Sequence, residues 1–284
     1  MILIRTQRGF NLIELMIVGL LTILSGYFMI QIMMNSNQSA TSSDGVSQAQ
    51  ETARLALSWL HQDIRRAGFS ANLQEPRTQP FADLCTNGNA PPNDMGNCTF
   101  ESNVPGDTSN DRIAIRRTFS PASNDPRDST DCSGADLTGL AGLVPEETIL
   151  TDVYWVEAHM TNTGYDDPYD DVLKCTTYND DTSQAIRTAA LASGIEGMQV
   201  MYASSSAGFG SVTHYQPASS SLDMENVYAV RISVLARSFS VSALDESTRS
   251  YILLDAMPYT FEDKTPRQIL TTTIALKNYS EPDP

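Results

Sequence analysis

Residues 10–34 read FNLIELMIVGLLTILSGYFMIQIMM, and Glu14 is the only formally charged side chain among them. A helix rises about 1.5 Å per residue, so about 20 such residues cross the roughly 30 Å hydrocarbon core of a bilayer. Arg5 and Arg8 precede the segment, and flanking basic residues favour a cytoplasmic N-terminus. We predict a membrane-spanning helix with the rest of the chain on the outer side.

Glu14 separates this segment from an ordinary signal sequence or anchor. A secretory signal has a shorter apolar region, of about 7 to 15 residues, before its cleavage site. Inserting a carboxylate into a membrane costs about 2 to 3 kcal/mol, and such groups usually have a partner. Because no Lys or Arg follows within the segment, Glu14 either lies at the interface of a lone anchor or pairs with a cation from another subunit.

The residues around the start of the segment favour the second alternative. Residues 8–15, RGFNLIEL, resemble the type IV prepilin signature, in which a short basic leader ends in Gly9 and a Glu stands fifth after the cut. The resemblance implies cleavage between Gly9 and Phe10 by prepilin peptidase, and methylation of the new Phe10 amine. It also implies that this amine pairs with Glu14 of a neighbouring subunit, because each charge makes burial of the other tolerable.

Helical periodicity resumes after the polar residues 35–43. Apolar residues recur three or four apart, at Val46, Ala49, Ala53, Leu57, Leu60 and Ile64. No proline interrupts residues 10–67, and Gly68 is a suitable C-terminal stop. We predict one long helix. If the helix is loosened at any point, residues 36–45 are the expected place. Its first half would lie in lipid or in a filament core, and its second half under a β-sheet.

The remainder is predicted to be β-rich with long loops at 70–111 and 120–147. Runs rich in Val, Ile, Thr and aromatic residues occur at 111–117, 148–160, 172–178, 197–203, 227–239, 251–254 and 268–276. Alternation of Val230, Ile232, Val234 and Ala236 with more polar neighbours predicts a strand with one face on the helix. An antiparallel meander is the simplest topology. Strand aromatics such as Tyr154 and Trp155 are expected in the core.

The four cysteines are Cys85, Cys98, Cys132 and Cys175. They lack the close CxxC spacing of zinc sites and lie beyond the apolar segment, which favours disulfides in an oxidising compartment. Four cysteines allow three connectivities. Proximity in the sequence favours Cys85 with Cys98 and Cys132 with Cys175, and such bonds would tie down the long loops.

Further stretches resemble the PilW group of type IV pilus assembly proteins. One is ARLALSWLHQDIRRAGF at 53–69, and the others are GIEGMQVMYA at 194–203, VYAVRISVLARS at 227–238 and RQILTTTIALKN at 267–278. The resemblance implies an α+β, pilin-like fold in which the long N-terminal helix packs on an antiparallel β-sheet domain. The expected parts are a leader 1–9, a membrane or filament-core helix 10–34, an amphipathic helix 35–69 and an extracytoplasmic domain 70–284.

The same resemblance implies a minor pilin that acts in pilus initiation. Its partners would be the other minor pilins, the major pilin, prepilin peptidase and the inner-membrane assembly platform. It would start in the inner membrane with its domain in the periplasm and reach the pilus, with adhesion and twitching motility as downstream effects. The alternatives are a type II secretion pseudopilin, which shares the leader and anchor, and a membrane-anchored adhesin or binding protein.

Composition and motifs argue against other classes. The net charge is −16, from 18 Lys and Arg against 34 Asp and Glu, and such a surface repels nucleic acid. Neither a nucleophile elbow, a P-loop, a metalloprotease motif nor a dinucleotide fingerprint occurs, so we expect neither enzyme activity nor a cofactor.

An acidic stretch could bind calcium. Residues 164–172, GYDDPYDDV, place Asp166, Asp167, Asp170 and Asp171 close together, and calcium prefers such oxygen ligands. The spacing is not that of an EF-hand loop, so a solvated acidic turn is the prediction and calcium the alternative.

Overall fold

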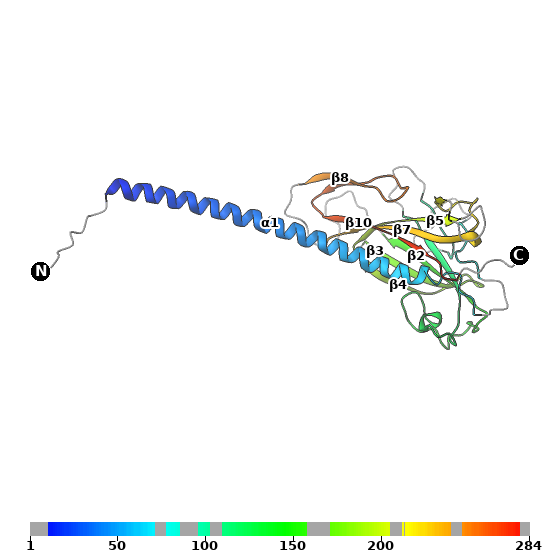
Figure 1. Cartoon of the computed structure of the whole chain (residues 1–284). Coiled ribbons are helices and arrows are strands. Elements are labelled where there is room, and N and C mark those ends of the chain that lie inside the picture. The colour runs from blue at the N-terminus through cyan, green and yellow to red at the C-terminus, as the bar shows by residue number, and fades with distance from the viewer. Residues whose placement is uncertain are drawn as a thin grey trace.

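The computed structural model describes residues 11–71, 78–85, 96–102, 110–157, 171–204, 212, 214–239 and 246–278. One long helix, α1 (Leu12–Ile64), projects from a β-rich domain that packs against one side of its C-terminal part (Figure 1). Its 53 residues correspond to a length of about 80 Å. The predicted α+β arrangement, a long N-terminal helix packed on antiparallel sheets, is confirmed.

Helix α1 runs unbroken through residues 36–45, so the loosening allowed for there does not occur. The Thr41 hydroxyl in this stretch bonds back to the helix, donating to the Asn37 carbonyl at 3.0 Å. Gly45 is buried at the point where the helix enters the domain. A Cβ there would lie 2.9 Å from Cγ of Pro266, so glycine permits a close approach and does not mark a break.

The helix ends as its sequence predicts. Arg65 is the C-cap, and Gly68 adopts a φ of 73°, a left-handed conformation that glycine reaches without strain. The Gly68 N–H donates to the Arg116 carbonyl at 2.9 Å, which directs the chain onto the first sheet.

The first sheet is an antiparallel meander in chain order. Its strands are β1 (Ile113–Thr118), β2 (Ile149–Glu157), β3 (Val172–Asn179) and β4 (Gln184–Ser193). The loop between β1 and β2 contains the short 3-10 helix η1 (Pro126–Ser129). Strand β4 was not predicted, because its many Ala residues have low β-propensity and half of its side chains are exposed.

The second sheet departs from the predicted meander. Its strands are β5 (Ile195–Ser204), β6 (His214–Gln216), β7 (Val227–Arg237) and β10 (Arg267–Ala275), in the order β10-β7-β5-β6. After β6 the chain passes through η2 (Met224–Asn226) and returns to the opposite side of β5. That return places β7 beneath α1, where its apolar face is buried.

Strands β8 (Ser247–Tyr251) and β9 (Tyr259–Asp263) form a separate antiparallel pair. The strand predicted at 251–254 is therefore wrong apart from Tyr251. Leu254 has a φ of 46°, which belongs to a turn. Leu253 and Tyr259 instead pack on Leu235, so β7 is covered on both faces.

The main core joins the helix to both sheets. The predicted stripe of α1 is buried at Ala53, Leu60 and Ile64, in one cluster with Val230 and Val234 of β7. Burying one such large aliphatic side chain contributes about 1.5–3 kcal/mol. The predicted core positions of Tyr154 and Trp155 are also confirmed, because both are buried.

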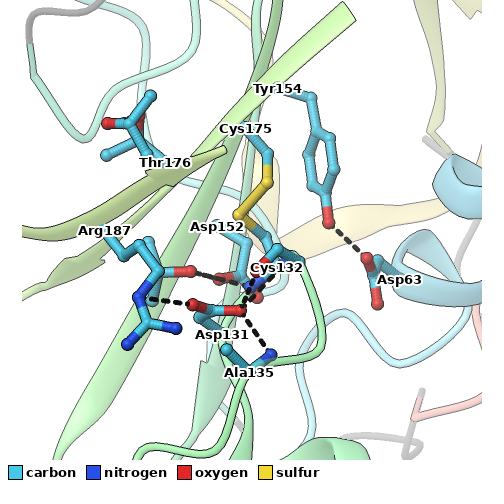
Figure 2. Close-up of a disulfide and its surroundings, with 12 residues drawn as sticks. Asp63, Asp131, Cys132, Ala135, Asp152, Tyr154, Cys175, Thr176 and Arg187 are labelled. Atoms are coloured by element: carbon cyan, nitrogen blue, oxygen red, sulfur yellow. Dashed lines mark hydrogen bonds and ion pairs between the residues drawn. A yellow bond between two sulfur atoms is a disulfide. The ribbon is translucent and has the colours of Figure 1, made fainter. Parts of the chain in front are cut away.

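Two disulfides tie the loops to the sheets. They join Cys85 to Cys98 and Cys132 to Cys175, which is the pairing favoured from the sequence. The second bond fastens the loop that follows η1 onto β3 (Figure 2). The Cys132 N–H also donates to Thr177 Oγ1 of β3 at 2.9 Å, so the attachment is both covalent and polar.

Candidate assembly interface

The N-terminal half of α1 is exposed although it is apolar. Leu12, Ile23 and Met29 are each at least 74% exposed, and the large apolar side chains between them are exposed too. By length and composition this helix could cross a membrane. A contiguous apolar surface of this extent marks a contact with lipid or with another protein.

Three polar side chains within this half bond inside the helix. Thr22 Oγ1 donates to the Val18 carbonyl at 2.7 Å, Ser25 Oγ donates to the Thr22 carbonyl at 2.9 Å, and Gln31 Nε2 donates to a tyrosine hydroxyl one turn earlier at 3.3 Å. A polar group that already has a partner can enter an apolar environment at low cost.

Glu14 differs from them because the helix offers its carboxylate no cation. It stands in the first turn of α1, and the next basic residue along the helix is Arg54, about 60 Å away. The positive end of the helix dipole favours a carboxylate by only about 0.3–1 kcal/mol. Gly9 and Phe10 lie outside the described residues, so cleavage between them and the pairing of Phe10 with Glu14 stay predictions.

The other end of α1 is fixed to the first sheet by buried polar contacts. Asp63 accepts a hydrogen bond from the Tyr154 hydroxyl (Figure 2) and pairs with Arg66 at 2.8 Å. Burial raises the pKa of Asp63, whereas the Arg66 guanidinium acts to lower it. Arg117 and Asp152 form a fully buried ion pair beside them, with Nε 2.7 Å from Oδ2.

A second buried network connects the two sheets. Arg267 of β10 pairs with Glu196 of β5 at 2.5 Å, and Arg237 of β7 lies 3.1 Å from Asp171. Burial raises the pKa of Glu196, against the effect of Arg267. These buried networks were not predicted from the sequence. The available signal was the presence of Arg, Asp and Glu within otherwise apolar strands, but which of them pair depends on the fold.

Asp171 was one of the four calcium candidates, and it is buried beside this network. Asp166, Asp167 and Asp170 lie outside the described residues. Within the part of the chain that the structure describes, no group of three or more His, Cys, Asp or Glu side chains is arranged to hold a metal ion. Asp171 therefore contributes to an ion pair with Arg237, and calcium binding is untested.

The helix is also held where it enters the domain. Gln48 Oε1 accepts hydrogen bonds from Ser238 Oγ and from the Phe239 N–H, each at 3.1 Å. Beyond this point α1 packs mainly on β7 and β10. Helix α1 thus has an exposed apolar half that is continuous with a half docked on the domain.

The C-terminal part of the chain is similar to a known family. This part includes β7 and β10, the two strands on which α1 mainly packs. Residues 153–278 match the model of the Type IV Pilus-assembly protein W family, PilW. The PilW resemblance predicted from the sequence is confirmed by this match. A type IV-like pilin from Thermus thermophilus is a structural match with a TM-score of 0.46 and 10% identity, over 81% of this chain and 95% of that one. No curated protein matches the chain.

The PilW match begins within β2 and ends just after β10. It therefore includes β7 and β10, the two strands on which the docked half of α1 packs. The sequence stretches at 194–203, 227–238 and 267–278 lie inside the matched range, whereas 53–69 lies before it.

Proposed function

We propose that the chain is a minor pilin, a structural subunit that takes part in the initiation and assembly of type IV pilus fibres. In this proposal it joins other minor pilins and the major pilin in a priming complex at the inner membrane, and then reaches the pilus, at or near its tip. Adhesion and twitching motility would follow from assembly. The proposal is supported by the PilW match and by the long helix α1, which has an apolar N-terminal half and a C-terminal half packed on the domain.

The observation that carries the proposal is the exposed apolar half of α1 with Glu14 as its only formally charged side chain. Before assembly the half would lie in the membrane, with the domain in the periplasm. In the fibre it would pack against the equivalent helices of neighbouring subunits. Glu14 would then meet the Phe10 amine that prepilin peptidase creates, since a buried charge requires an opposite charge nearby.

Replacing Glu14 by Ala tests this proposal in the cell. We expect the variant to insert into the membrane in normal amounts, because removing a charge favours insertion, and to lose most surface pili and cross-links to other pilins. Glu51→Ala is the matched control, because Glu51 is an exposed acid on the same helix outside the apolar half. Normal piliation with Glu14→Ala would contradict the pairing.

The N-terminal mass of the membrane-extracted protein gives an independent readout of the class. A methylated Phe10 that appears only when prepilin peptidase is present would support a pilin. Retained Met1 would point to an ordinary anchor. If deletion of the protein abolished secretion through a short periplasmic filament and left pili intact, a pseudopilin would be the better description.

A further inference from the structure

A pocket of about 430 Å³ lies where the C-terminal end of α1 meets η1 and the segment after β10. Four cationic side chains line it: Arg65 and Arg66 from the helix end, Arg127 from η1, and Lys277. The whole chain has 18 Lys and Arg residues and a net charge of −16. A gathering of four cations in one cavity is therefore contrary to the general charge of the molecule.

Arg66 is the buried member of this set, with 8% of its surface exposed. Its Nη2 lies 2.8 Å from Asp63. Among the described residues its Nε and Nη1 have no hydrogen-bond acceptor, since Nη1 is 3.8 Å from the nearest oxygen of Asp128. Both atoms are themselves covered by the protein. Arg66 therefore contributes positive charge to one wall of the pocket, and the other three cations would make the direct contacts with a ligand.

The other three cations are placed around it by local structure. The Lys277 N–H donates to the Arg65 carbonyl at 3.2 Å, which holds Lys277 beside the end of the helix. Arg127 is positioned by η1, whose N-cap Asp125 accepts from the Arg127 N–H at 3.0 Å. Within the described ranges, the side chains of Arg65, Arg127 and Lys277 form no ion pair of 4.0 Å or less.

Two carboxylates line the same pocket but have other partners. Asp125 caps η1, and Asp128 accepts a hydrogen bond from Ser123 Oγ at 2.5 Å. Among the described lining side chains, four cations and two acids leave an excess of two positive charges, one of which is offset by Asp63 beside Arg66. His61 also lines the pocket, and its imidazole has an N–H donor.

From this arrangement we propose that the pocket binds a small oxyanion, that is, a ligand with carboxylate or phosphate groups. Guanidinium groups bind both kinds of oxyanion through paired N–H donors, and such charge-assisted bonds are strong. The volume exceeds that of a single phosphate ion, and Phe69 provides an apolar wall. A small organic acid with several carboxylates, or a phosphorylated molecule of similar size, therefore fits.

The pocket is well separated from the apolar half of α1. It lies at the opposite end of α1 from Glu14, about 75 Å along the helix axis. It is thus remote from the apolar surface through which subunits would associate. Oxyanion binding does not depend on the proposed assembly role, and either could fail without the other.

Calorimetry on the full-length protein in a neutral detergent at low ionic strength tests the proposal, with citrate and inorganic phosphate as separate probes. We expect saturable binding of at least one probe at one site. The double substitution Arg65→Gln and Arg127→Gln should weaken it by about tenfold or more, as expected for losing two charge-assisted contacts. Tighter binding of citrate would identify carboxylates as the ligand groups, and tighter binding of phosphate would identify a phosphate.

Arg54→Gln is the control, because Arg54 lies on the same helix outside the pocket. It removes one positive charge, as each of the two pocket substitutions does. Its affinity should equal that of the unaltered protein. The proposal would be overturned if neither probe saturated at millimolar concentration, or if Arg54→Gln weakened binding as much as the double substitution. If the double variant had a lower melting temperature than the unaltered protein, Lys277→Gln would replace it, because Lys277 is exposed. This substitution should also weaken binding of the probe.

Discussion

Two adjacent arginines on β1 show how strongly context decides the role of a residue. Arg117 is fully buried and pairs with Asp152, which also accepts a hydrogen bond from Thr177 at 2.6 Å. Arg116 faces the other side of the strand and pairs with Asp180 at 2.6 Å, with almost a fifth of each side chain exposed. Water screens only the second pair, so we expect unequal contributions to stability.

Asp152→Ala should therefore lower the free energy of unfolding by about 3–5 kcal/mol, since it leaves Arg117 buried without a counterion. Asp180→Ala should cost only about 1 kcal/mol, because its pair is partly exposed. Urea unfolding of the full-length protein in detergent measures both. Equal losses of unfolding free energy would show that burial does not make the Arg117–Asp152 pair more stabilising than the Arg116–Asp180 pair.

At the scale of elements, the docking of α1 depends on small residues as much as on large ones. Gly45 touches Pro266 in the segment between β9 and β10, at the first point of contact between helix and domain. Gly26 lies in the exposed apolar half, where a Cβ would meet nothing within 4 Å. The two glycines share a helix but not an environment.

We predict that Gly45→Ala destabilises the domain by about 1–3 kcal/mol, because the added methyl forces Pro266 or the helix to move. Gly26→Ala should be neutral or stabilising, by about 0.5–1 kcal/mol, through helix propensity alone. Thermal unfolding followed by near-ultraviolet circular dichroism distinguishes them. A stabilising Gly45→Ala would mean that the contact with Pro266 adjusts freely.

The sequence predicted the elements better than it predicted their connections. Periodicity was enough for α1 and for β7, because one stripe and one alternating face are each visible in a single segment. The position of β7 beside β5 was missed, since strand order is decided by packing on the helix. The oxyanion pocket was missed for a similar reason, because its cations come from three segments that meet only in the fold.

At the scale of the whole molecule, buried acids make stability depend on pH. Burial raises the pKa of Glu101 to about 9, and the nearby carboxylates of Asp111 and Asp255 act in the same direction. Glu101 is 8% exposed and accepts a hydrogen bond from the Ala218 N–H at 3.1 Å. Since an unfolded Glu has a pKa of about 4.3, the folded state binds the proton more tightly.

The stabilisation from neutral Glu101 is thus complete below about pH 4 and is lost as the pH rises to about 9. We predict that the urea midpoint of the full-length protein falls steadily between pH 5 and pH 9, about the window that this shift defines. Glu101→Gln should flatten that decline, because the amide does not titrate. Parallel profiles for both proteins would assign the pH dependence to other groups.

The unbroken helix also sets the angular relation between the two ends of the molecule. Each residue turns the chain by about 100°, so removing four residues from the exposed stretch 35–44 would rotate the domain by about 40° relative to the apolar half, whereas removing seven would nearly restore the original phase. Both deletions shorten the part of α1 that precedes the domain. The number of residues before Gly45 therefore determines which side of the domain is aligned with a given side of the apolar half, and insertions there would change that alignment.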